Sequence, residues 1–369
     1  MQVTYTGITF YIISFVFSLF FMKLSELELN REKLYSNAIF FNKSIFFLFL
    51  SCCTLWGVAA IRGHVGLDYD SYSYKIGLIT DWEKIFLYEP GFGALSLFVN
   101  KLGLDFHALM FVMSLGTGIF LWISIYRDAK NFSLSLLGVF AVNYYFMSFS
   151  VIRQFFAISI VLLSVPYIVK RKFIKFLLVV FAACLFHYTA IIFILLYFLV
   201  PRKIGKVFTY KNLIVTLVLL IGLAYLENLL NAILPIVGNF KENYSGYTLD
   251  SNSEKSFRSV IFIMPIILFA FYYNKKLVQC NKTNVVYIWM SFLLFLTSCI
   301  GVISPSFSRF HYYFSFSIVI LFSYLSSLFK GGLLLLNVIL VLIYYFWSIY
   351  NVFQYQWNDF LPYHTMWDI

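Results

Sequence analysis

The stretch FHALMFVMSLGTGIFLWISIY (106–126) decides the fold class. Its 21 residues contain no Asp, Glu, Lys or Arg, and Leu, Ile, Met, Val and Phe dominate it. A helix of about 20 apolar residues reaches across the roughly 30 Å of hydrocarbon in a bilayer. The stretch is therefore predicted to be a transmembrane helix, and other apolar runs of the chain can be compared with it in length and composition.

Similar apolar runs recur from one end of the chain to the other. Of the 369 residues, 62% are hydrophobic and 12% are charged, about half the charged fraction of a soluble domain. Backbone N–H groups in lipid must be bonded internally, and no run alternates as a membrane β-strand does. We expect an all-α, polytopic transmembrane helical bundle, with one integral membrane domain over residues 1–369. About twelve crossings are expected near 4–22, 45–61, 106–126, 132–149, 153–169, 175–187, 188–200, 212–233, 257–273, 285–303, 310–329 and 331–349.

Two segments depart from the simple pattern. Basic clusters flank both ends of 175–200, so a single crossing would put one cluster on the wrong side of the membrane. Two short helices that meet near His187 are therefore expected. The segment 91–104 is too short to span and contains polar residues, which predicts a short re-entrant segment buried in protein or lining a cavity.

The distribution of charge predicts the orientation. The net charge is +11, but the basic residues form short clusters between apolar spans, so nucleic acid is not an expected partner. We expect the following segments to lie in the cytoplasm: 23–44, 127–130, 170–175, 201–211, 274–282 and Lys330. Together they hold 18 of the 27 Lys and Arg, as the excess of basic residues in cytoplasmic loops requires. The extracytoplasmic side then holds both termini, the loop and re-entrant segment 62–104, and a second loop, 234–256.

Several function classes are excluded by what the sequence lacks. It has no P-loop, no GxGxxG turn before a helix, no HExxH and no polar stretch long enough for a soluble catalytic domain. The five cysteines show neither metal-ligand spacing nor a disulfide framework. No cleavage site follows the first apolar run, which is expected to be retained. Chemistry must therefore occur among the helix ends, and neither a metal nor a cofactor is expected.

A dense polar cluster, IRGHVGLDYDSYSYKI (61–76), interrupts this apolar chain. Arg153, His187 and Arg309 also lie near the ends of spans, and the predicted topology puts them on the same side as Arg62. A guanidinium group stays charged and offers five donors, so three such groups at headgroup level predict a phosphate or pyrophosphate site. The alternative is that each arginine snorkels or pairs with a nearby acid, for which Asp68 and Glu89 are available.

Two residues are candidates for proton transfer. Asp68 could act as a general base near a reacting hydroxyl, or it could cap a short surface helix. His187 could accept a proton near neutral pH, or it could be a hydrogen-bonded packing residue in an apolar helix.

Short motifs then follow one another in a recognisable order. They are R–x5–D–Y–x2–Y (Arg62, Asp68, Tyr69, Tyr72), EPGF (89–92), RQ (153–154), FHYTA (186–190), R–x3–Y (Arg309, Tyr313) and the ending WNDFLPYHTMW (357–367). In this order they resemble the EpsG-like family of polysaccharide polymerases, Wzy-type enzymes of bacterial capsule, exopolysaccharide and O-antigen assembly. One departure is GLDY at 66–69, where family members often have GTDY.

The resemblance implies a metal-independent glycosyltransferase of the multispanning, lipid-linked-donor class, GT-C-like in fold. It would work in the bacterial inner membrane, with its active site facing outside. The growing glycan on undecaprenyl pyrophosphate would be the donor, and a lipid-linked repeat unit the acceptor. The acceptor sugar hydroxyl would attack the anomeric carbon, and undecaprenyl pyrophosphate would leave. Membrane lipid and a chain-length-regulating membrane protein are the further partners implied.

The resemblance also assigns roles to residues. It implies that Arg62, Arg153 and Arg309 bind the pyrophosphate, and that Asp68 or His187 takes the hydroxyl proton. The residues left for substrate binding are Tyr69, Tyr72, Glu89, Gln154 and Tyr313. EPGF and the segment 91–104 would shape the floor of the cavity.

Two other functions use the same kind of lipid. A flippase or transporter of polyprenyl-linked glycans would distribute charges along the depth of the membrane, whereas here they gather on one side, and no inverted repeat is visible. An O-antigen ligase shares the donor and the fold class, but it would be expected to have one large outer loop. Both remain alternatives.

Overall fold

The computed structural model describes residues 2–34, 42–202, 258–303 and 309–329 continuously, with isolated positions elsewhere that include 207–208, 360–361 and 363–367. The spans expected at 212–233 and 331–349 are described only at isolated positions, and the loop 234–256 lies outside the described residues. The chain divides into two compact units, Met1–Phe193 with Ile318–Ile369, and Ile194–Ser317.

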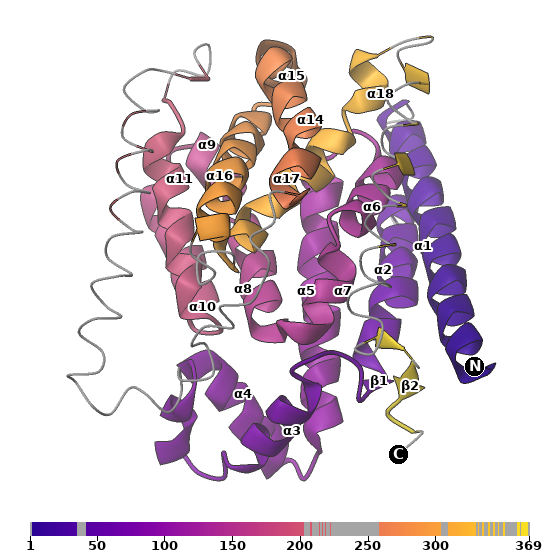
Figure 1. Cartoon of the computed structure of the whole chain (residues 1–369), viewed down its shortest axis with the longest axis vertical. Coiled ribbons are helices and arrows are strands. Elements are labelled where there is room, and N and C mark those ends of the chain that lie inside the picture. The colour runs from indigo at the N-terminus through magenta and orange to yellow at the C-terminus, as the bar shows by residue number, and fades with distance from the viewer. Residues whose placement is uncertain are drawn as a thin grey trace. The chain divides into compact units, whose positions relative to one another are not determined.

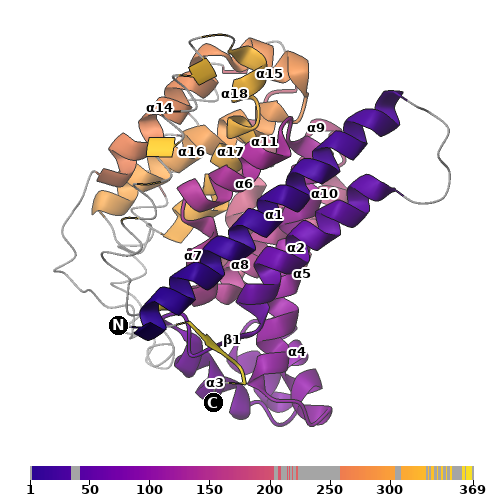
Figure 2. The same ribbon diagram turned by 90° about the vertical axis from the view of Figure 1, so that its right-hand side faces the viewer.

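The first unit begins with a helical hairpin of α1 (Gln2–Leu34) and α2 (Lys43–Ala60), which lie side by side in Figures 1 and 2. Serines join the two helices: Ser18 Oγ lies 2.9 Å from Ser51 Oγ, and Ser25 Oγ lies 3.2 Å from Ser44 Oγ. Small side chains at such an interface allow the two backbones to approach closely. The helix expected at 4–22 is shorter than α1, which continues to Leu34.

The stretch at 106–126 forms α5 (Phe106–Asp128), as predicted. Asp105 caps its first turn by accepting a hydrogen bond from Ala108 N at 3.3 Å. Among the described residues, four helical stretches are long and apolar enough to cross a membrane: Gly7–Arg31, Lys43–Ala60, Phe106–Asp128 and Asn284–Gly301. The bent pair α6 (Phe132–Ala141) and α7 (Tyr144–Ser150) can be counted as a fifth. The protein is an all-α membrane protein.

Several expected spans are interrupted helices. The axes of α6 and α7 differ by 52°, and Asn143 between them has a left-handed φ of 54°. The next span consists of α8 (Ile152–Leu162) and α9 (Val165–Val169). The break predicted near His187 is confirmed, since α10 (Phe173–Cys184) ends before it and η2 (Tyr188–Phe193) begins after it.

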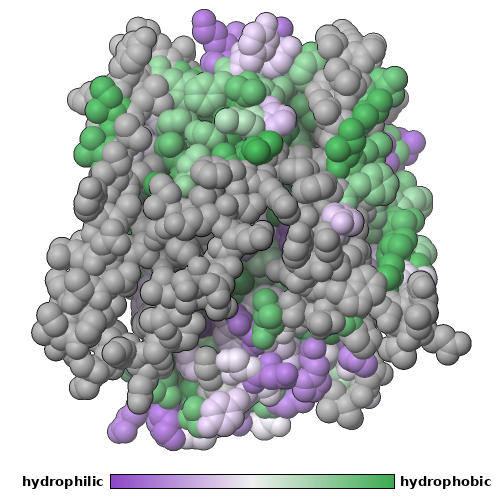
Figure 3. Space-filling view, in the orientation of Figure 1, coloured by the Kyte–Doolittle hydropathy of each residue, from purple (hydrophilic) through white to green (hydrophobic). Residues whose placement is uncertain are grey.

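Short elements gather at one end of this unit. They are α3 (Tyr69–Gly77), η1 (Glu83–Leu87) and α4 (Pro90–Lys101), which follow the two-residue strand β1 (Arg62–Gly63). Figures 1 and 2 both show α3 and α4 beyond the end of α8, and Figure 3 shows hydrophilic residues collecting there. The chain's last described segment reaches the same end, where β2 (His364–Thr365) pairs antiparallel with β1.

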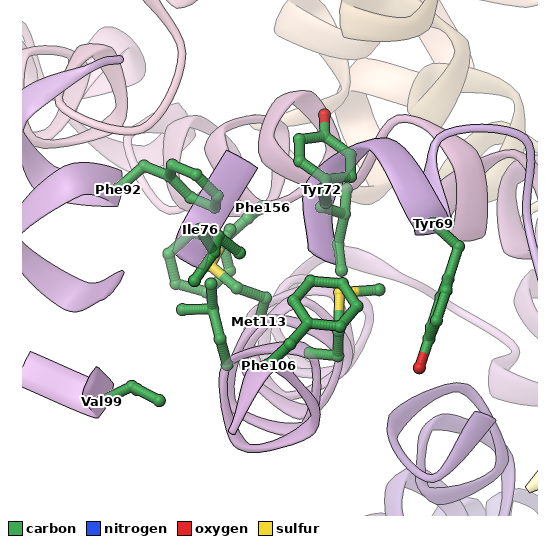
Figure 4. Packing of buried hydrophobic residues seen from close by; sticks show 11 residues of the cluster. Tyr69, Tyr72, Ile76, Phe92, Val99, Phe106, Met113 and Phe156 are labelled. Atoms are coloured by element: carbon green, nitrogen blue, oxygen red, sulfur yellow. The ribbon is translucent and has the colours of Figure 1, made fainter. Parts of the chain in front are cut away.

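An apolar cluster attaches α3 and α4 to the long helices. Tyr72 and Ile76 of α3 and Phe92 of α4 pack with Met113 of α5 and Phe156 of α8. In Figure 4 the ring of Tyr72 lies in this cluster while its hydroxyl points out of it. Apolar packing thus holds α3 and α4 against α5 and α8, and the Tyr72 hydroxyl lies at the edge of the packed cluster.

The second unit contains α11 (Ile194–Leu199), α14 (Arg258–Tyr272), α15 (Asn274–Cys280) and α16 (Asn284–Ile303). Trp289 of α16 donates from Nε1 to the Val207 carbonyl at 2.9 Å. The helix α17 (His311–Phe322) runs across the residue boundary of the two units, and α18 (Leu325–Leu328) belongs to the first.

Candidate functional site

A buried carboxylate connects two motifs that lie far apart in the sequence. Glu89 precedes α4, and only 6% of its side chain is exposed. Its Oε1 lies 2.7 Å from Nδ1 of His187, which sits in the break between α10 and η2. The EPGF and FHYTA motifs therefore meet through a hydrogen-bonded acid–imidazole pair.

The second oxygen of the same carboxylate holds an arginine. Glu89 Oε2 accepts from Arg153, which stands in the first turn of α8. The guanidinium Nε donates to the Tyr72 hydroxyl at 3.3 Å. Its central carbon also lies 5.1 Å from the ring centre of Tyr88 and 5.3 Å from that of Phe92, within the range of cation–π attraction. Glu89 thus bridges a cation and a titratable imidazole.

The backbone of EPGF explains why this contact can form. Pro90 takes the first position of α4, where a missing N–H costs nothing. Gly91 and Phe92 both donate from N to the Leu185 carbonyl, at 2.8 and 3.2 Å. A Cβ on residue 91 would lie 2.8 Å from that carbonyl oxygen, so the close approach requires glycine. The two hydrogen bonds fix the start of α4 beside the segment that carries His187.

The electrostatics of Glu89 favour an ionised group. Burial raises the pKa of the Glu89 carboxyl, but the hydrogen bond with His187 and the charge of Arg153 lower it more, so the pKa lies below its usual value. An ionised carboxylate can only accept, so the Nδ1 of His187 carries the proton that is shared with it. The other ring nitrogen, Nε2, makes no hydrogen bond with any residue that the structure describes.

Arg62 has a different environment from Arg153. Its side chain is buried, and it donates to the main-chain carbonyls of Ala59, Val65 and Phe149 and to Ser114 Oγ. These four hydrogen bonds join α2, the loop that follows it, α5 and the end of α7. The structure therefore places Arg62 in the framework of this loop and not in the Glu89 cluster.

The loop around Arg62 is also tied to the C-terminal segment. Arg62 and Gly63 pair with Thr365 and His364, and Met366 N donates to the Ile61 carbonyl at 2.8 Å. Part of the C-terminal motif (357–367) thus pairs with the segment 61–63.

Asp68 and Tyr69 lie at the start of α3. Asp68 directly precedes this helix, and its carbonyl accepts a hydrogen bond from Tyr72 N at 2.9 Å. Asp68 therefore occupies the capping position that the sequence analysis gave as the alternative to a general base. Tyr69 is buried and its hydroxyl donates to the Arg62 carbonyl at 3.4 Å. Tyr72 is therefore the one tyrosine of the DYxxY motif whose hydroxyl contacts the Glu89 cluster.

The remaining predicted residues lie in α8 and in or just before α17. Gln154 is buried in α8, next to Arg153 in the chain. Arg309 is exposed and Tyr313 is buried, both near the start of α17 in the second unit. Sequence reasoning missed Tyr88, and it gave Phe92 a role only as part of EPGF, in the floor of the cavity. Both residues lie within three positions of Glu89 in the chain, and aromatic residues so close to an acid were the available signal. Among the described residues, no group of three His, Cys, Asp or Glu could hold a metal ion.

The fold and the site together define a multispanning α-helical membrane protein with a buried, charged cluster at the ends of its helices. A family model described as the EpsG family matches residues 45–365, from α2 to β2. The chain belongs to this family of EpsG-like polysaccharide polymerases, which implies a glycosyltransferase-like polymerase activity. No curated protein and no solved structure gives a significant match to the chain.

Proposed function

We propose that this protein joins undecaprenyl-pyrophosphate-linked oligosaccharide repeat units outside the bacterial inner membrane. In this proposal about twelve crossings form a GT-C-like bundle with a re-entrant segment, and a chain-length-regulating membrane protein cooperates with it. The growing glycan moves as a block to the acceptor, and neither a metal nor a nucleotide takes part. Family membership supports the polymerase class, and the geometry at Glu89 supports the assignment of the proton acceptor.

The observation that carries the mechanism is the 2.7 Å contact between Glu89 Oε1 and His187 Nδ1. A carboxylate at Nδ1 fixes the imidazole tautomer and stabilises the imidazolium that forms after proton uptake. His187 Nε2 then accepts the proton of the acceptor sugar hydroxyl as its oxygen attacks the anomeric carbon. The bond between that carbon and the pyrophosphate oxygen breaks, and undecaprenyl pyrophosphate leaves with the bonding electrons.

The arginines have different parts in this proposal. Arg153 holds Glu89 ionised and, with Arg309, attracts the negative pyrophosphate, whose charge rises as it leaves. Arg62 fixes the loop from which α3 starts. Tyr72 joins α3 to Arg153, and Tyr69, Gln154 and Tyr313 shape the site around the sugars. Asp68 is the second candidate for the proton acceptor.

A pair of matched histidine variants tests the proposal. His187→Asn and His64→Asn change two histidines that each bond a carboxylate, Glu89 and Asp70 respectively. His64 has a left-handed φ of 51°, which asparagine tolerates well, and its pair with Asp70 is exposed. Each variant would be expressed at matched membrane abundance in a host that lacks its own polymerase, and the lipid-linked glycan would be separated on a gel.

The expected result is a long ladder with wild type and His64→Asn, and a single repeat unit with His187→Asn. A normal ladder from His187→Asn would overturn the assignment of the proton acceptor, and the same experiment with Asp68→Asn would then test the second candidate. Loss of outward-facing repeat units, measured by labelling intact cells, would indicate a flippase instead.

A further inference from the structure

Large apolar side chains are exposed on elements that are too short to cross a bilayer. The exposed fractions of Trp82, Phe86 and Phe98 are 64%, 72% and 60%. The first two lie at or in η1, which has 5 residues, and the third in α4, which has 12. A helix of 12 residues is about 18 Å long, well short of the hydrocarbon thickness. These side chains therefore need another explanation than a membrane crossing.

The same elements already have a buried side. Ile85 of η1 and Leu97 of α4 pack with Ile79 in a small core. Phe98 and Leu102, four residues apart in the chain, are both exposed. Among the described residues, these elements thus bury one set of apolar side chains and leave another set exposed.

The uncovered side has the residues that favour a membrane–water boundary. Lys101 Nζ lies 5.2 Å from the ring centre of Trp82, which places a cation beside an exposed indole. Tryptophan is enriched at headgroup level, and lysine near it can extend its amine to water while its stem covers apolar surface. Leu87, in η1, and Leu104, three residues after α4, are 47% and 50% exposed.

Exposed apolar side chains also lie on α10, which contacts the start of α4. Ile174, Leu178 and Phe181 of α10 form an exposed stripe with the spacing of one helix face, at 68%, 63% and 62%. The stripe leads to Leu185, whose carbonyl accepts from Gly91 N at 2.8 Å. The start of α4 is therefore fixed where the exposed apolar stripe of α10 ends.

We propose that η1 and α4 form a surface anchor, in which Trp82, Phe86, Leu87, Phe98, Leu102 and Leu104 insert between phospholipid headgroups at the adjacent leaflet. Elements of this kind lie in the interface with their apolar side at the boundary of headgroups and acyl chains. The partner is phospholipid, and no protein is required to cover the surface. Because Glu89 connects η1 to α4, the anchor holds the Glu89–His187 pair at a fixed depth.

Lipid photocrosslinking tests this anchor in the full-length protein. The photoreactive residue p-benzoylphenylalanine would replace Phe86 or Phe98 in separate variants, and each variant would be reconstituted into vesicles of phosphatidylethanolamine and phosphatidylglycerol with a trace of alkyne-tagged phospholipid. Phe181 of the α10 stripe is the positive control. Tyr74 is the matched negative control, since it is an aromatic residue of α3 that is 73% exposed and lies between Ser73 and Lys75 in the chain.

The expected result is a lipid adduct at positions 86 and 98 comparable with that at 181 and several-fold above that at 74. Adducts at 181 without adducts at both 86 and 98 would overturn the anchor. Crosslinks from 86 or 98 to a second copy of the chain, seen as a dimer on a denaturing gel, would show a protein-covered surface and would also overturn it. Equal adducts at 74 would show that the whole loop meets lipid, which would overturn a specific anchoring side.

Discussion

Arg62 and Arg153 both lie against aromatic rings, but the charges of their partners differ. The Arg62 guanidinium lies 4.7 Å from the Phe149 ring centre and bonds three main-chain carbonyls. Arg153 lies among the rings of Tyr72, Tyr88 and Phe92, and its ionic partner is the Glu89 carboxylate. The first set of contacts is neutral apart from the arginine itself, whereas the second contains an acid that is shared with a histidine.

This difference separates a structural arginine from one that can influence chemistry. Carbonyl partners fix the position of Arg62 and join segments that are 87 residues apart, but they cannot exchange protons with a substrate. The Glu89 carboxylate bonds both Arg153 and His187, so a change at the arginine alters the anion that orients the imidazole. We therefore expect changes around Arg62 to affect mainly stability, and changes around Glu89 to affect mainly activity.

The largest expected effect is that of Glu89→Gln on polymer synthesis. The amide keeps the size of the side chain, but it cannot stabilise an imidazolium and it leaves Arg153 without its anion. Loss of the carboxylate that orients a catalytic histidine can lower a rate by about 10⁴-fold, so the gel should show the single repeat unit. The measurement is polymer formed per amount of folded protein in purified membranes.

The control for this variant is Asp70→Asn. It removes a carboxylate that also bonds a histidine, His64 Nδ1 at 2.6 Å, but at an exposed position outside the Glu89 cluster. Polymer synthesis should stay near the wild-type rate. Equal losses in Glu89→Gln and Asp70→Asn would mean that any acid–histidine pair of this loop matters, and the comparison of the two regions would fail.

The second effect concerns stability and uses Arg62→Met. Methionine keeps much of the apolar volume but removes the donors to Ala59, Val65 and Phe149. Buried acceptors without partners should lower the free energy of unfolding by on the order of 3 kcal/mol. Thermal unfolding in detergent measures the change, with Lys101→Met at an exposed cation as the control. Unchanged stability together with lost polymer would indicate that Arg62 binds the donor, as the resemblance implied.

The sequence predicts the frame of this site better than its contacts. The apolar length of 106–126 identifies α5, and basic clusters on both sides of 175–200 identify the break that holds His187. The sequence also offered pairing of an arginine with a nearby acid, Asp68 or Glu89, as the alternative to a phosphate site. Which arginine does so cannot be read from the sequence, because Arg62 and Arg153 have the same chemistry. Arg62 bonds main-chain carbonyls such as that of Phe149 instead of Glu89, and these carbonyls are close to Arg62 only in the folded chain.

A smaller effect is expected from Gly91→Ala, which alters the position of Glu89 without changing any charge. The new Cβ would approach the Leu185 carbonyl oxygen to 2.8 Å, so the start of α4 must move away from the segment that carries His187. Overpacking of this kind costs about 1–3 kcal/mol, and the ladder should become shorter. Gly77→Ala is the control, because nothing lies within 4 Å of its added Cβ. A normal ladder from Gly91→Ala would mean that the site tolerates a displaced α4.

The smallest effect is a difference in acid stability, which reports the charge of Glu89 directly. The hydrogen bond from His187 and the charge of Arg153 outweigh burial and hold the pKa of Glu89 below its usual value of 4.5. The unfolded chain therefore binds more protons than the folded one in this range, and stability rises with pH. The contribution is complete above about pH 4.5 and is lost as the pH falls through the lower, folded pKa.

Comparison with a variant isolates this contribution from other acids. The pKa of Asp105 is also lowered, chiefly by its hydrogen bond with His107, so wild type alone loses stability in acid for more than one reason. Unfolding midpoints measured in detergent from pH 7 to pH 3 should fall less steeply for Glu89→Gln than for wild type. Asp105→Asn should flatten the same curve without removing polymer at neutral pH. If Glu89→Gln and wild type lose stability in parallel, Glu89 is not held ionised, and the contrast drawn between the two arginines loses its physical basis.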